Sequence, residues 1–90
     1  MEVVTPIIHM NGDRKDTLIR NLEDAYRAVR AAQLALRECA PNGRNYYPEP
    51  GRFERARAQY DARMAQLERV IESLDAEARK IEDETRGNRA

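Results

Sequence analysis

The sequence predicts an all-α protein: an antiparallel two-helix hairpin that follows an extended N-terminal leader and is completed by oligomerisation. Two long stretches carry apolar residues at alternating spacings of three and four, the repeat of helices that pack lengthwise. A loop with three prolines separates them, and a short connection favours helices that fold back on each other. We therefore divide the chain into a leader at 1–12, a hairpin at 13–86 and a frayed tail at 87–90.

The first predicted helix covers 13–40. Pro41 ends it, because proline has no N–H to donate and disfavours helical backbone in the residue before it. Apolar residues at heptad spacing form a seam along this helix, and we expect them to be buried, Cys39 included. The seam consists of Leu18, Leu22, Ala25, Val29, Ala32, Leu36 and Cys39.

The second predicted helix covers 51–85 and follows a loop at 41–50. From Tyr60 onward its apolar residues again alternate spacings of four and three, so this helix supplies the facing seam of the hairpin. The seam consists of Phe53, Ala56, Tyr60, Met64, Leu67, Ile71, Leu74, Ala78 and Ile81.

The charges are balanced in total but not in position. Sixteen Lys and Arg side chains oppose sixteen Asp and Glu, which argues against a dedicated nucleic-acid binder, and no apolar run is long enough for a membrane span. Residues 68–84 hold seven acids against three bases. In an antiparallel hairpin this acidic end lies beside Arg14, Lys15 and Arg20, so the charge pattern supports the predicted fold.

Single copies of the chemically reactive residue types limit the possible sites. Cys39, His9 and Ser73 each occur alone, so one chain lacks the residues for a disulfide, a Cys/His zinc site or a serine triad. We expect no catalysis, no metal and no cofactor. The leader lacks the basic start of a signal peptide, so the expected location is the cytoplasm.

Oligomerisation is expected because two helices alone cannot enclose a core. The simplest assembly is a dimer that forms a four-helix bundle, with higher oligomers as the alternative. The leader then packs either over an exposed flank of its own hairpin or over the second helix of a partner. The predicted interface residues are Val4, Ile7, Ile8, Ile19, Tyr26, Tyr60, Leu67, Ile71 and Leu74.

The loop has the chemistry to bind a small anionic, nucleotide-like molecule. Arginine offers a fork of donors to phosphate, and neighbouring tyrosines offer faces on which a base can stack. The leader could contribute to such a site only from another copy, since it lies at the far end of the hairpin. The alternative is that Tyr46 or Tyr47 only plugs the end of the bundle. The predicted ligand-binding residues are Asn42, Arg44, Asn45, Tyr46, Tyr47, Arg37, Arg52, His9 and Asn11.

Two sequence motifs resemble small proteins of tailed phages and prophages that have no established activity. They are His-Met-Asn-Gly at 9–12 and Pro-Asn-Gly-Arg-Asn-Tyr-Tyr at 41–47. The size and helical content are also similar to oligomeric phage anti-defence proteins that sequester immune nucleotide signals, the anti-CBASS and anti-Thoeris sponges. That second resemblance covers architecture only and assigns no residue.

The resemblances imply a phage protein in the host cytoplasm that sequesters a cyclic nucleotide or an ADP-ribose-type molecule. The alternative is a helical protein–protein interaction module that inhibits a host protein or assists phage assembly.

Overall fold

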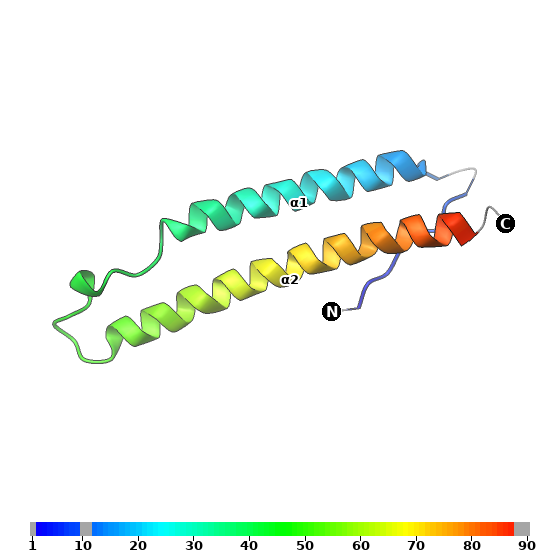
Figure 1. Cartoon of the computed structure of the whole chain (residues 1–90). Helices are drawn as coiled ribbons and strands as arrows, with labels where there is room; N and C mark the ends of the chain where they lie inside the picture. The colour runs from blue at the N-terminus through cyan, green and yellow to red at the C-terminus, as the bar shows by residue number, and fades with distance from the viewer. Residues whose placement is uncertain (1, 10–11, 88–90) are drawn as a thin grey trace.

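The computed structural model of the chain describes residues 2–9 and 12–87, and these form an antiparallel two-helix hairpin with an extended leader (Figure 1). Helix α1, Lys15–Arg37, contacts helix α2, Arg52–Gly87, and a short 3-10 turn, η1, Gly43–Asn45, lies in the connection. The molecule measures 65 × 20 × 19 Å, with a Cα radius of gyration of 19.1 Å. A compact domain of this length would have a radius of roughly 12 Å. The predicted hairpin is therefore confirmed, as an elongated rod.

Helix α1 is shorter at both ends than the predicted 13–40. It begins at Lys15, after an extended Arg14. Beyond Arg37 the backbone tightens: the N–H of Cys39 donates to the carbonyl of Leu36, three residues back rather than four. Pro41 follows after one more such bond, so the last three predicted residues form a turn.

The predicted seam of α2 is confirmed along its whole length. Ile71 and Ile81 are 2% and 1% exposed, and they are the buried apolar residues of the described chain. The other seven seam positions are half-buried, as two contacting helices without further cover allow: Phe53, Ala56, Tyr60, Met64, Leu67, Leu74 and Ala78.

The predicted seam of α1 is wrong at two positions. Ala32 is exposed, and its neighbour Gln33 is buried instead, at 6% exposure. The cause is a hydrogen bond from the Gln33 amide to Glu68 of α2, which holds this polar side chain between the helices. Cys39 is exposed because α1 ends before reaching it.

The leader folds against its own hairpin, along the C-terminal part of α2 (Figure 1). The Thr5 hydroxyl donates to the Glu84 carboxylate at 3.2 Å, and Pro6 and Ile8 line a groove together with Ile81. The leader thus covers a flank within the chain, one of its two predicted positions. Much apolar surface still faces outward, because Ile7 is 83% exposed.

Candidate functional site

The predicted ligand loop is held by its own hydrogen bonds. The side-chain Oδ1 of Asn42 accepts a hydrogen bond of 3.0 Å from the backbone N–H of Arg44 and caps η1. The backbone N–H of Asn45 donates to the Asn42 carbonyl at 2.9 Å. Asn42 therefore shapes the loop with the oxygen that would otherwise be offered to a ligand, although Asn42 and Asn45 are both exposed.

The two adjacent tyrosines differ in their surroundings. Tyr46 is half-buried, and its ring centroid lies 6.2 Å from that of Phe53 at the start of α2, with a tilt of 44°. This packing ties the loop to the helix, as in the end-plug interpretation. Tyr47 is 84% exposed, so its ring is the one with a free face for stacking.

The predicted arginines divide into paired and unpaired groups. Arg52 is held by Glu49 through its Nε and also through Nη2, which lies 3.1 Å from Oε1. Arg55 reaches the same carboxylate at 3.1 Å. Arg37 and Arg44 are exposed, and no described residue forms an ion pair with either one. Arg37 and Arg44 are therefore the predicted ligand-binding arginines that have no ion-pair partner among the described residues.

The predicted leader contribution lies at the opposite end of the rod from the loop (Figure 1). The carbonyl of His9 accepts a hydrogen bond from the N–H of Gly12 at 3.2 Å. Asn11 falls outside the described residues. One chain thus brings together the predicted loop residues but not His9.

The predicted interface residues fall into three groups. Ile71 is 2% exposed, so its side chain is used within the chain and has no surface left for a partner. The leader residues Val4, Ile7 and Ile8 are exposed by 71%, 83% and 40%. The remaining five are half-buried: Ile19, Tyr26, Tyr60, Leu67 and Leu74.

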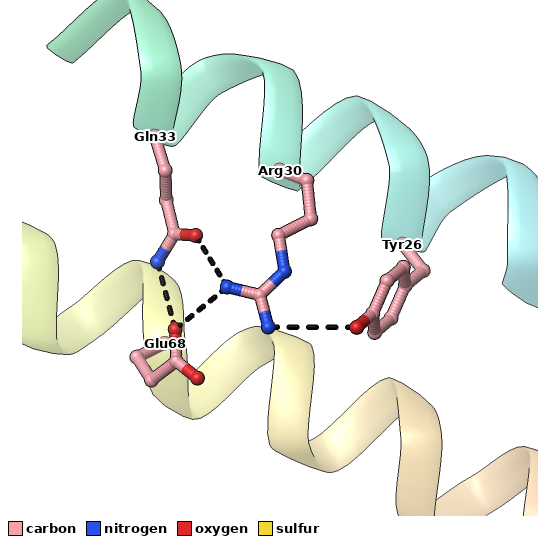
Figure 2. A network of polar contacts seen from close by, with 4 residues as sticks. All are labelled: Tyr26, Arg30, Gln33 and Glu68. Atoms are coloured by element: carbon pink, nitrogen blue, oxygen red, sulfur yellow. Dashed lines mark hydrogen bonds and ion pairs between the residues drawn. The ribbon is translucent and has the colours of Figure 1, made fainter. Parts of the chain in front are cut away.

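A polar network that the sequence did not predict lies between the helices (Figure 2). The Gln33 amide donates to Glu68 Oε2 at 2.9 Å, and Arg30 Nη1 lies 3.1 Å from the same oxygen and 2.8 Å from Gln33 Oε1. Arg30 Nη2 donates to the Tyr26 hydroxyl at 3.4 Å, and its guanidinium carbon lies 5.4 Å from the centre of the Tyr26 ring. These contacts fix both helices at one level.

The network shifts the protonation of its two charged members. The hydrogen bond from Gln33, followed by the attraction of Arg30, lowers the pKa of Glu68 below its ordinary 4.5. The hydrogen bond to Tyr26, followed by the attraction of Glu68, raises the pKa of Arg30. Both groups are therefore held in their charged forms, as an ion pair requires. The sequence signal was present, since Gln33 continues a three–four spacing from Tyr26 and Val29.

In the part of the chain that the structure describes, no three His, Cys, Asp or Glu side chains gather closely enough to hold a metal ion. No described helix is both long and apolar enough to cross a membrane. A scan of protein families, a search of curated proteins and a search of solved structures each found no match.

Proposed function

We propose that this chain is a non-catalytic binding protein that acts as a homo-oligomer, and that it is foremost a helical protein-interaction module. The observation that supports this most strongly is its exposed surface of 7132 Å². A compact protein of 10.4 kDa would expose roughly 5,400 Å². The excess of about 1,700 Å² is more than the roughly 800 Å² that each partner buries in a typical stable interface.

The distribution of apolar residues supports the same proposal. Only Ile71 and Ile81 among the described apolar side chains are buried, which is a thin core for a chain of 90 residues. Leu34 and the leader residue Ile7 are 59% and 83% exposed. Association with other helices would cover such surface, and it would add hydrophobic stabilisation that one hairpin lacks.

For the partner protein, the proposal follows the phage resemblance: a host protein that is inhibited, or a phage protein whose assembly is assisted, in the host cytoplasm. Leu34 is the best single probe, because it is a large apolar side chain on the outer side of α1. Affinity purification from host lysate tests this. We expect one protein in stoichiometric amount with the wild-type chain and its loss with Leu34→Glu. Equal recovery with both chains would argue against this surface.

A second candidate function is the binding of a small anionic, nucleotide-like molecule at the loop end. The observation that favours it is the exposure of Arg44 and Tyr47 on a loop whose backbone is already fixed by Asn42. Arg44 would pair with phosphate, Tyr47 would stack on a base, and Arg37 and Asn45 would assist. His9 would join this site only from another copy. An anti-defence sponge for a cyclic nucleotide or an ADP-ribose-type signal is the form this function would take.

Calorimetric titration with cyclic dinucleotides, cyclic trinucleotides and cyclic ADP-ribose isomers tests the second candidate. We expect heat of binding with at least one of them, lost in Arg44→Ala and kept in Arg57→Ala, a matched variant on α2 outside the loop. Helicity by circular dichroism and the solution mass should be unchanged in both variants. Titrations that show no heat of binding with any of the three classes would contradict the second candidate and leave protein interaction as the proposed function.

A further inference from the structure

The hairpin has two unlike faces. One is the ion-paired face, where Arg30 and Lys15 of α1 lie 3.1 Å and 2.8 Å from Glu68 and Glu82 of α2. A helix turns by about 100° per residue, so residues two positions away from these point to the other side. Ala28 and Val70 are such residues, and both are exposed. We call the side that carries Ala28 and Val70 the open face. It ends where the leader begins to cover it, because Ile81, eleven residues after Val70 and on the same side of α2, is buried beside Pro6 and Ile8.

On α1 the open face is uncharged and made of small side chains. Its residues follow one another at spacings of three and four, so they share one stripe. Small side chains allow a second helix to approach closely. Most of the stripe is exposed, with Ala25 half-buried, and from end to end it contains Asn21, Ala25, Ala28, Ala32 and Ala35.

On α2 the open face carries one basic and one acidic residue at equal distances from Val70. Arg63 precedes Val70 by seven residues and Glu77 follows it by seven, so the three share a stripe. Among the described residues neither Arg63 nor Glu77 has a hydrogen-bond or ion-pair partner. Fourteen residues separate them, about 21 Å along a helix, so they cannot pair within one chain.

The two stripes are centred at the same level of the rod. Arg30 meets Glu68 across the antiparallel pair, so stepping two residues back on α1 and two forward on α2 sets Ala28 level with Val70. A single two-fold axis at this level, perpendicular to the helices, would place both stripes against the same stripes of a second copy. It would bring Val70 near the partner's Val70 and Ala28 near the partner's Ala28. It would also bring each Arg63 to the partner's Glu77.

We propose that a second copy of this chain packs antiparallel on the open face about this axis, with Arg63 of each chain paired to Glu77 of the other. The inference rests on the oligomer of the proposed function and specifies its interface. The same axis carries each leader to the partner's loop end, because the leader lies at one end of the rod and the loop at the other (Figure 1). Exposed Ile7 would be covered there, and His9 would approach the partner's Arg44 and Tyr47.

A charge-swap series followed by sedimentation equilibrium tests the interface. In Arg63→Glu and in Glu77→Arg, two attractive pairs per dimer become repulsive, and we expect the dimer Kd to rise roughly tenfold or more. When one chain carries both substitutions, position 63 of each chain again faces an opposite charge at position 77 of the other chain. Dimerisation should therefore return. Recovery in the double variant supports the interface, whereas a Kd unchanged by the single substitutions overturns it.

Ala28→Glu provides an independent arm, since it sets two like charges near the axis. It should abolish dimerisation, and Ala31→Glu, the same change on an exposed α1 position outside the stripe, should not. The wild-type chain can be oligomeric while Ala28→Glu raises the dimer Kd no more than Ala31→Glu does. That result would show that the proposed interface is wrong, although the chain still self-associates. If the wild-type chain is monomeric, the oligomer of the proposed function fails as well. Circular dichroism confirms that each variant keeps its helices.

Discussion

Gln33 of α1 and Glu68 of α2 face each other across the hairpin, and the Gln33 amide donates a hydrogen bond of 2.9 Å to the Glu68 carboxylate (Figure 2). Gln33 is 6% exposed, so a polar side chain occupies a position of the seam where an apolar one would pack. Arg30 contacts both residues and completes the set. A polar layer of this kind favours one register of two helices, because any slip would bury its amide without partners.

Replacing Gln33 by alanine should destabilise the chain. The substitution removes a hydrogen bond to a charged group and leaves a gap at a buried position, at a cost of about 1–2 kcal/mol in the free energy of unfolding. Urea unfolding followed by circular dichroism measures this. Gln66→Ala, at an exposed position of α2, is the control and should change stability by less than about 0.5 kcal/mol. Equal effects of the two substitutions would show that the network does not hold the helices.

Acid should weaken the hairpin through Glu68. Its pKa in the folded chain is lowered by Gln33 and then by Arg30, so the folded state favours the carboxylate relative to the unfolded state. The resulting stabilisation is complete at pH values above the unfolded pKa near 4.5, and it is lost as the pH falls through the folded pKa. Urea unfolding between about pH 6 and about pH 3 should therefore show a decline that is shallower in Glu68→Gln.

The matched control for the acid experiment is Glu54→Gln, at an exposed position in the first turn of α2. This variant should keep the wild-type slope of stability against pH, because no described residue forms a hydrogen bond with Glu54. A slope that is the same in Glu68→Gln as in the wild-type chain would contradict the assigned role of Glu68.

Two loop glycines should respond differently to alanine. Gly51 has a φ of +82°, a left-handed conformation in which a side chain is strained, so Gly51→Ala should cost about 1–2 kcal/mol. At Gly43 no neighbouring atom lies within 4 Å of the position a Cβ would take, and its φ is not positive. Gly43→Ala should therefore be neutral or slightly stabilising. The melting temperatures of the two variants test this, and the reverse order would contradict the described loop.

The contact between the leader and the helices can be tested at Ile81. This side chain is 1% exposed and lines the leader groove with Pro6 and Ile8. Ile81→Ala should lower the free energy of unfolding by about 2–5 kcal/mol, and Ile81→Val by about 1 kcal/mol if the alanine variant does not fold. Leu34→Ala, at a position 59% exposed, should have a much smaller effect. A comparable loss at both positions in urea unfolding would count against the leader packing.

The sequence predicted the parts of the fold that depend on apolar spacing. The α2 seam is continuous because each of its positions is apolar, and Lys15 pairs with Glu82 as the charge pattern predicted. On α1 the spacing allowed either Ala32 or Gln33 at the buried seam position. The prediction took Ala32 because it is apolar, and this was wrong. The choice depends on Glu68 of the other helix, a contact that α1 alone does not reveal.

The candidate site was predicted less completely, for a similar reason. The sequence offered Tyr46 and Tyr47 as equal candidates for stacking or packing, and the position of Phe53 separates them, because it holds the Tyr46 ring. Arg52 has the right chemistry to bind an anion, but its guanidinium already forms an ion pair with Glu49. These outcomes are set by three-dimensional neighbours rather than by residue type.

One hairpin leaves much of its apolar surface exposed, and we propose that it self-associates. Sedimentation equilibrium of the purified wild-type chain at micromolar concentration tests it most directly. We expect a mass of at least twice the 10.4 kDa of one chain, because the exposed surface of the single rod is far larger than that of a compact protein. A mass equal to that of one chain throughout the micromolar range would contradict the claim.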